Sequence, residues 1–241
     1  MGKQLPGIDL EILEKVNKYR EIRIKELKEG NTQIQPFISD KKIVLQLIPL
    51  EAFSIPREYD ILKLGDKFDQ LLKPLWDIKR DNEYNFEGRI NYVYEERNTL
   101  TGTEAIAVSY VQFFRNGIIE AVDGHYSSLS AILINNIEQT IILNTELYLQ
   151  FQEKMEISVP IGWGLSLIKV AGLSLDIGPL NINRKNIHPI LKNDLILPLI
   201  TIDKFGLDIK KLLRISFDRI WNACGYPRSF QYDKNGEFKA V

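Results

Sequence analysis

The stretch YVQFFRNGIIEAVD, from Tyr110 to Asp123, constrains the fold more than any other part of the sequence. Two runs rich in β-branched and aromatic residues lie on either side of Asn116-Gly117. Such a pair supplies the positive φ angles of a two-residue type I′ turn, so the stretch predicts an antiparallel hairpin. The segment 86–95 alternates like a further strand, and RNTLTGTE after it has the composition of a turn. These segments together predict an antiparallel meander.

Helical periodicity is present in three stretches, at 10–28, 129–156 and 208–224. Asp9 and Asp208 are typical N-cap residues for the first and the last of these helices. The apolar spacing predicts that the first helix buries Leu13, Val16, Tyr19 and Leu27. The same spacing predicts that the last helix buries Leu212, Ile215, Ile220 and Trp221.

The rest of the chain predicts more strands and one irregular region. The run 42–48 is mostly apolar and ends at Pro49, as a buried strand would. Less regular assignments are strands over 162–177 with a bend at Gly172, a strand over 194–205 interrupted by Pro198, and a loop over 54–85 with a short helix near 68–76. We therefore predict an α+β fold, with mostly antiparallel sheet and helices near the N-terminus, in the middle and at the C-terminus. The chain forms either one compact unit over 1–241 or two lobes, 1–126 and 127–241.

Overall charge and cysteine content exclude several classes of protein. The 31 basic and 32 acidic residues nearly cancel, whereas a protein that coats nucleic acid by itself is usually far more basic. Cys224 is the single cysteine, which rules out an intramolecular disulfide and a four-thiolate zinc site. The sequence has neither an apolar signal core after Met1 nor a run long enough to span a bilayer. These features predict a cytoplasmic protein.

Charge is nevertheless distributed unevenly along the chain. Residues 116–183 carry seven acidic and two basic side chains, a net charge of −5. Residues 184–241 carry eleven basic and six acidic side chains, a net charge of +5. A basic C-terminal quarter is the best indication in the sequence of a surface that faces phosphate groups.

Motifs of common enzyme classes are missing from the sequence. It contains no GxxxxGK[ST], GxGxxG, GxSxG or HExxH pattern. Glu120, Asp123 and His125 lie close together after a predicted strand, and carboxylates with a histidine can bind a divalent metal. The alternative is that these residues belong to an ordinary solvated turn. Cys224 follows a helix end, so no helix dipole would activate its thiol.

Five phrases in this order match a group of prokaryotic proteins: YREIRIKEL, KIVLQLIPLEAF, EYNFEGRI, YVQFFRNGIIEAVD and FDRIWNACGYPRSFQYD. The chain resembles the C-terminal region found behind a Schlafen-type AlbA_2 domain, a domain associated with DNA and ATP binding. The resemblance covers nearly the whole chain but not the AlbA_2 domain itself. No catalytic residue of the family maps onto this region. The resemblance thus implies a chain that is not an enzyme, with no catalytic residue, no cofactor and no metal of its own.

Seven basic residues are candidate nucleic-acid contacts: Arg20, Arg23, Arg115, Lys210, Lys211, Arg214 and Arg228. The four arginines at 20, 23, 115 and 228 fall within the matching phrases. Arginine also clamps carboxylates and carbonyls in protein interiors, so a structural role is the alternative for each. Aromatic residues near Arg228, namely Trp221, Tyr226 and Tyr232, could stack on bases or form an aromatic corner of the core.

The leading hypothesis is a non-catalytic accessory subunit of a prokaryotic nucleic-acid-handling complex in antiviral defence. One form would be a partner of a truncated Argonaute that supplies its missing N-terminal and linker lobes. Such a subunit would form a heteromeric complex with a protein partner and reach nucleic acid through that complex. The alternatives are a free-standing DNA-binding regulator and a metal-dependent nuclease or hydrolase that uses Asp123 and His125.

Overall fold

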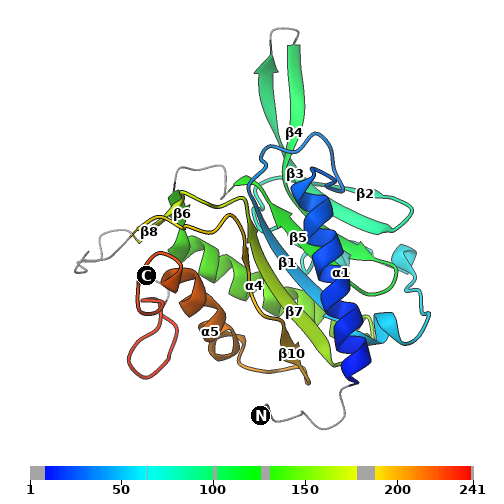
Figure 1. Cartoon of the computed structure of the whole chain (residues 1–241). Coiled ribbons are helices and arrows are strands. Elements are labelled where there is room, and N and C mark those ends of the chain that lie inside the picture. The colour runs from blue at the N-terminus through cyan, green and yellow to red at the C-terminus, as the bar shows by residue number, and fades with distance from the viewer. Residues whose placement is uncertain (1–8, 64, 100–101, 126–130, 178–187, 240–241) are drawn as a thin grey trace.

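The computed structural model describes residues 9–63, 65–99, 102–125, 131–177 and 188–239 (Figure 1). Its centre is an eight-stranded sheet in the order β10-β7-β1-β5-β4-β3-β2, with β9 paired to β7. The pairs in this sheet are antiparallel. The strands are β1 (Lys42–Pro49), β2 (Arg80–Tyr84), β3 (Gly88–Thr99), β4 (Gly102–Phe114), β5 (Ile119–Asp123), β7 (Ile161–Ile168), β9 (Leu195–Ile196) and β10 (Ile200–Ile202).

Helices cover both faces of this sheet. The main ones are α1 (Leu10–Lys28), α4 (Ile134–Lys154) and α5 (Ile209–Asn222). Successive strand residues point to opposite faces, so Val44 packs in one cluster with Ile24 and Leu27 of α1. Ile43 and Leu45 face the other way, into the larger cluster formed with α4 and α5. The predicted α+β fold and its antiparallel sheet are confirmed.

Short elements complete the described chain. These are the 3-10 helices η1 (Leu50–Phe53) and η2 (Ile61–Lys63), the helix α2 (Asp66–Asp69), and the parallel pair β6 (Ala131–Leu133) and β8 (Ser174–Asp176). Strand β1 pairs with β5 on one side and with β7 on the other. Strands from both predicted lobes therefore share one sheet. None of the helices among the described residues is long and apolar enough to cross a membrane.

The first helix has the bounds predicted from its caps. Asp9 accepts a hydrogen bond from the backbone N–H of Glu11 at 2.9 Å, as an N-cap should. Val16 and Leu27 are buried as predicted, whereas Leu13 and Tyr19 are half-buried. The helix also buries Arg20, Arg23 and Ile24. Two arginines on the core face depart from the simple apolar pattern.

The hairpin between β4 and β5 forms, but its turn differs from the prediction. Gly117 has φ +89°, while Asn116 is not among the described residues with positive φ. The N–H of Gly117 donates to Phe114 O and the N–H of Phe114 donates to Ile118 O, both at 2.9 Å. The loop is therefore a three-residue turn that ends in one left-handed glycine, and the predicted two-residue type I′ turn is wrong. A bulged turn of this kind also matches the twist of the strands.

Strands β3 and β4 are longer than predicted. Their pairing continues through Glu96↔Ala105 to Thr99↔Gly102, where the sequence suggested a turn. The residues at this end, from Glu95 to Asn98 on β3, are exposed. The two strands project from the body as a two-stranded ribbon (Figure 1). The turn assignment failed because an exposed ribbon lacks the alternation of apolar residues that marks a half-buried strand.

Other boundaries shift in similar ways. Residues 131–133, predicted as helix, form β6, while α4 agrees with the prediction over 134–154. Strand β2 lies in the segment predicted as loop, and the short helix α2 begins before its predicted position. The predicted features at Gly172 (φ +83°) and Pro198, which separates β9 from β10, are present. The exposed side chains of β2 explain why the strand was missed.

The buried face of α5 differs from the predicted one. Ile220 and Trp221 are buried as expected, but Ile215 is 68% exposed and Leu212 is half-buried. The remaining buried positions are Ile209, Leu213, Ser216 and Phe217. The helix is thus rotated relative to the prediction, because Leu213 and Phe217 with Ile220 and Trp221 make the wider apolar stripe.

Ile215→Ser is expected to change the free energy of unfolding by less than about 0.5 kcal/mol, because the side chain is exposed. Leu213→Ser, two residues earlier and on the opposite, buried face, should cause a much larger loss. Urea unfolding of both variants measures the difference. Equal losses would contradict the observed rotation of α5.

Candidate functional site

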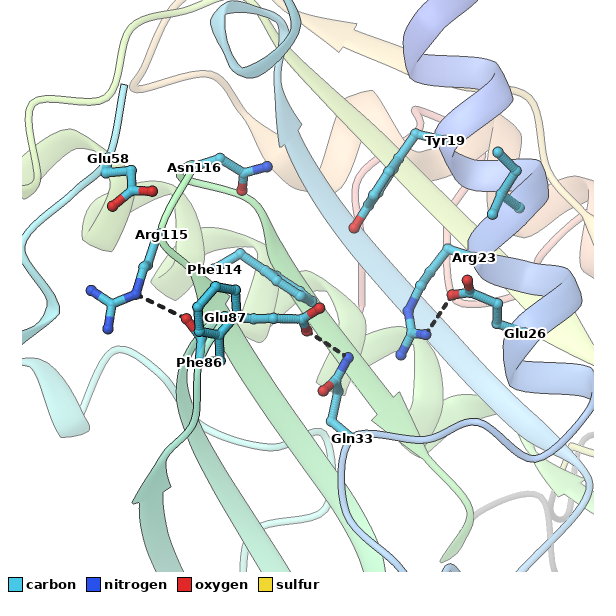
Figure 2. Close-up of a pocket in the computed structure, with 11 residues that line it drawn as sticks. Tyr19, Arg23, Glu26, Gln33, Glu58, Phe86, Glu87, Phe114, Arg115 and Asn116 are labelled. Atoms are coloured by element: carbon cyan, nitrogen blue, oxygen red, sulfur yellow. Dashed lines mark hydrogen bonds and ion pairs between the residues drawn. The ribbon is translucent and has the colours of Figure 1, made fainter. Parts of the chain in front are cut away.

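An open groove lies between α1, the turn that joins β2 to β3, and the turn that joins β4 to β5 (Figure 2). Its volume is about 500 Å³. We call it the α1 groove. It is lined by Tyr19, Ile22, Arg23, Glu26, Gln33, Glu58, Phe86, Glu87, Phe114, Arg115 and Asn116.

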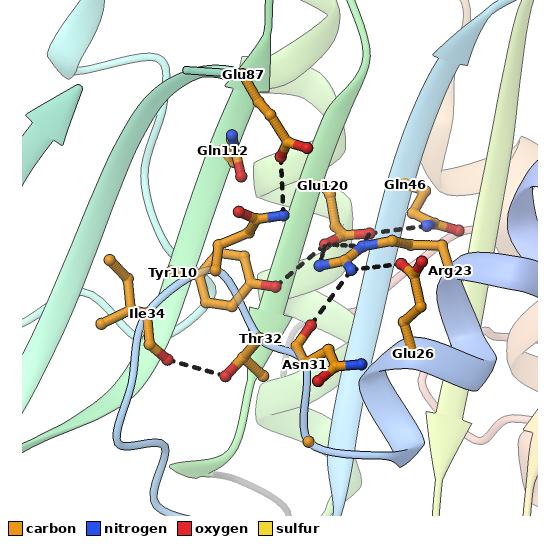
Figure 3. A network of polar contacts seen from close by, with 12 residues as sticks. Arg23, Glu26, Asn31, Thr32, Ile34, Gln46, Glu87, Tyr110, Gln112 and Glu120 are labelled. Carbon is orange, nitrogen blue, oxygen red and sulfur yellow. Dashed lines mark hydrogen bonds and ion pairs between the residues drawn. The ribbon is translucent and has the colours of Figure 1, made fainter. Parts of the chain in front are cut away.

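A buried carboxylate beneath the groove fixes α1 to the sheet (Figure 3). Glu120 of β5 is completely buried. Arg23 approaches it with Nε at 3.0 and 3.1 Å from the two carboxylate oxygens and with Nη2 at 3.0 Å from Oε1. Gln46 Nε2 donates to Oε2 at 3.0 Å, and the Tyr110 hydroxyl donates to Oε1 at 3.1 Å. Arg23, Gln46 and Tyr110 thus supply hydrogen-bond donors to both oxygens of the buried Glu120 carboxylate.

The guanidinium of Arg23 is occupied on its other edge as well. Nη1 donates to Glu26 Oε2 at 2.8 Å and to Asn31 O at 3.3 Å. Burial lowers the pKa of Arg23, but the charge and hydrogen bonds of Glu120, together with Tyr110 and Glu26, outweigh it and raise this pKa overall. Burial and the Glu120 charge raise the pKa of Tyr110. Arg23 therefore stays charged and acts as a structural clamp, which is the alternative role foreseen for it.

Arg20, one turn earlier on α1, is also buried. Its Nη2 donates to Leu197 O at 3.3 Å, and burial lowers its pKa. The guanidinium lies directly over Gly164 of β7, where an added Cβ would be 2.5 Å from Arg20 Nε. This close approach explains the second glycine of the GWG sequence. Neither Arg20 nor Arg23 presents its guanidinium at the surface as a phosphate contact would require.

Gly164→Ala is expected to destabilise the chain by about 1–3 kcal/mol, because the new methyl group must displace the Arg20 side chain. Gly172→Ala is not a matched control, since its φ of +83° adds backbone strain. Pairing Gly164→Ala with Arg20→Ala isolates the clash in a double-mutant cycle measured by urea unfolding. Additive losses would show that no such clash exists.

The walls of the α1 groove carry exposed apolar side chains. Phe86, in the turn before β3, is 94% exposed, and Ile22 of α1 is 51% exposed. Tyr19 and Phe114 line the same space, and the Tyr19 hydroxyl points into it (Figure 2). Scattered apolar residues are normal on a surface, but apolar side chains gathered at one hollow indicate an interaction site.

The charged residues of the groove are mostly acidic. Glu26, Glu58 and Glu87 line it together with Arg23 and Arg115. Since Arg23 is neutralised by Glu120 from below, the remaining formal charge is three carboxylates against Arg115, a net of −2. Arg115, a predicted phosphate contact, is half-buried among these carboxylates and donates from Nε to Phe86 O at 3.0 Å.

Backbone hydrogen bonds hold the rim in place. The N–H of Arg115 donates to Glu87 O at 2.8 Å, and the N–H of Tyr59 donates to Arg115 O at 2.7 Å. Gln33 Nε2 also donates to Glu87 Oε2 at 3.2 Å. The exposed side chains thus stand on a backbone that is already organised.

The predicted C-terminal cations lie elsewhere, on α5 and the segment after it. Lys210 is exposed, whereas the exposed Lys211 makes ion pairs with Glu237 at 2.8 Å and with Asp208 at 3.7 Å. Arg214 is half-buried and lies 3.9 Å from the carboxylate of Asp218. These residues form a surface of mixed charge, and their contact with nucleic acid stays a prediction.

Arg228 and its aromatic neighbours belong to the interior more than to the surface. The half-buried Arg228 donates from Nη1 to the backbone oxygens of Ser229 and Tyr232. Trp221 is completely buried, with its ring centroid 5.1 Å from that of Tyr226. Trp221 and Tyr226 therefore form an aromatic corner of the core, which is the second of the two interpretations given for these residues.

The candidate metal or catalytic residues Glu120, Asp123 and His125 also contact other parts of the protein. Asp123 is completely buried at the end of β5, and Glu120 is held by Arg23. His125 stacks on Trp76 with ring centroids 3.8 Å apart. Within the described ranges, no group of three or more His, Cys, Asp or Glu is placed to hold a metal ion. Burial raises the pKa of Cys224 to about 11, which makes its thiol a poor nucleophile.

Sequence reasoning missed the α1 groove. Its residues come from five separated parts of the chain. Glu58 lies in the region predicted to be irregular, and Phe86 directly follows it. No local motif marks them, because only the packing of α1 across the sheet brings them together. The chain matches no protein-family model, no curated protein and no solved structure.

Proposed function

We propose that the chain is a non-catalytic accessory subunit of a prokaryotic nucleic-acid-handling complex in antiviral defence, such as the partner of a truncated Argonaute. The observation that carries the proposal is the α1 groove, in which Phe86 and Ile22 are exposed on a fixed backbone. An open hollow with exposed apolar side chains suits a protein partner better than a small substrate, which is usually enclosed on most sides.

The nucleic-acid part of the proposal is supported by the sequence resemblance and by exposed cations. Lys210 on α5 and Lys234 and Lys239 after it are exposed. Acidic neighbours partly offset them, so this surface alone would bind phosphate weakly. In the proposed complex, most of the affinity for nucleic acid is provided by the partner.

Affinity purification of the tagged chain from its native host tests this proposal. A stoichiometric protein that co-purifies with short oligonucleotides is the expected result. The isolated chain should bind the same oligonucleotides much more weakly than the complex does. A lone monomer without nucleic acid, or full affinity in the isolated chain, would contradict the proposal.

A further inference from the structure

We propose that the α1 groove binds a segment of the protein partner through an arginine or lysine side chain flanked by apolar residues. This inference rests on the proposed function, because it names the surface and the chemistry by which the subunit holds its partner. It assigns no role in docking to the basic residues of α5.

Charge selects a cation as the central contact. Glu58 and Glu87 line the side of the groove opposite α1, and Glu26 lines it from α1. Both Glu58 and Glu87 are exposed, and neither makes an ion pair among the described residues. Their charges are therefore available to an incoming ammonium or guanidinium group.

The aromatic walls favour the same kind of group. Tyr19, Phe86 and Phe114 line the same hollow as these carboxylates, with Tyr19 on the α1 side and Phe86 on the opposite side. The faces of such rings attract a cation, and arginine is the residue that most often uses this contact. Aromatic rings combined with carboxylates recognise a basic side chain more specifically than either feature alone.

Nucleic acid fits this surface poorly. A phosphate at Arg115 would lie beside Glu58 and Glu87, since all three line the same hollow. The negative charges of the phosphate and of these carboxylates would repel each other and oppose binding. The repulsion argues for a basic protein segment and against a phosphate backbone as the occupant.

The groove also has room for an extended segment. A second hollow of about 570 Å³ shares Gln33, Phe86 and Glu87 with the α1 groove and continues past them to Thr32 and Asn85. The side chain of Phe86, which is 94% exposed, lies where the two hollows meet. Apolar residues next to the bound cation would cover Phe86 on one side and Ile22 on the other.

A peptide titration with the purified full-length chain tests the inference directly. The probe is an acetylated, amidated peptide of alternating leucine and arginine, and the matched peptide has glutamate in place of arginine. Backbone amide NMR signals of residues 19–26, 86–87 and 115–116 should shift with the arginine peptide only. Binding should weaken as salt is added.

Two variants of the groove and one control give the decisive comparison. Glu58→Gln/Glu87→Gln should weaken binding of the arginine peptide about fivefold, and Phe86→Ala about tenfold. Glu14→Gln/Glu21→Gln removes the same charge from exposed positions of α1 outside the groove and should leave the affinity unchanged. The melting temperature of Phe86→Ala should equal that of the parent chain, because the side chain is 94% exposed.

Several results would overturn the inference. They are equal binding of both peptides, equal weakening by the control pair, shifts confined to other surfaces, or no binding at all. An oligonucleotide that shifts the groove signals, or self-association of the chain through them, would identify a different occupant.

Purification from the host separates this inference from the proposed function. If the groove variants lose the partner while the control pair retains it, both proposals are supported. If all variants retain the partner, docking through the α1 groove is wrong and the accessory role stands. If the parent chain has no partner, both proposals fail.

Discussion

Arg23→Ala is expected to lower the free energy of unfolding by about 3–5 kcal/mol, because it leaves the Glu120 carboxylate buried without its cation. Gln46 and Tyr110 would remain as donors, but neither carries a positive charge. The loss should be accompanied by weaker attachment of α1, since Arg23 is the ionic link between this helix and β5.

Lys25→Ala is the matched control for this variant. It removes one positive charge from the same helix, but Lys25 is exposed and should contribute less than about 0.5 kcal/mol. Urea unfolding of the two variants measures the difference. Adding Glu120→Gln to Arg23→Ala should recover part of the stability, because a neutral amide is less costly to bury than a charge. Equal losses for Arg23→Ala and Lys25→Ala would show that the clamp contributes little.

The second large effect is a pH dependence caused by Glu138 of α4. This carboxyl group is completely buried, and burial raises its pKa from 4.5 to about 8. Trp221 Nε1 donates to Oε1 at 2.6 Å and the Ser229 hydroxyl donates to Oε2 at 2.9 Å, which offsets part of the rise. The nearby Asp218 adds to it.

The sign of the effect follows from the raised pKa. Between pH 4.5 and about 8 the folded chain keeps the proton of Glu138 and the unfolded chain loses it. Stability from this group is complete below pH 4.5 and is lost as the pH rises to about 8. In this window the free energy of unfolding should fall by up to about 1.4 kcal/mol for each unit of rising pH.

Glu138→Gln should remove this slope while keeping acceptors and donors for Trp221 and Ser229. Chemical unfolding of both proteins at intervals from about pH 5 to about pH 8 measures the slopes. The carboxyls whose pKa is lowered, at Glu51, Asp194 and Asp233, titrate below this window. Parallel curves for the parent chain and Glu138→Gln would contradict a raised pKa at this position.

Local sequence signals predicted the elements that are governed by local physics. Helix α1 begins after Asp9 and α5 after Asp208, because a side-chain oxygen at the N-cap satisfies free backbone N–H groups whatever the tertiary context. The buried strand β1 was visible because both of its faces pack against apolar layers. The exposed strand β2 has no such partner on either face, so its sequence has no strand pattern.

The sequence also did not show which charged residues are buried. Three of the seven acidic residues between 116 and 183, Glu120, Asp123 and Glu138, are completely buried, so the acidic middle of the sequence does not form a continuous acidic surface. Arg20 and Arg23 have the spacing of an exposed basic face and nevertheless lie inside. Composition counts charges without their partners, and the partner of Arg23 is 97 residues away in the chain.

The sequence by itself determined the α+β class, the caps of its helices, the antiparallel hairpin at Gly117 and the lack of common catalytic motifs, since each depends on neighbouring residues. Only the tertiary structure decided the turn type, the face of α5 that is buried and the pairing of Arg23 with Glu120. It alone also assembled the α1 groove from Tyr19, Glu58, Phe86 and Arg115. These features depend on which distant segments meet across the sheet, and that is fixed by the burial of a common core.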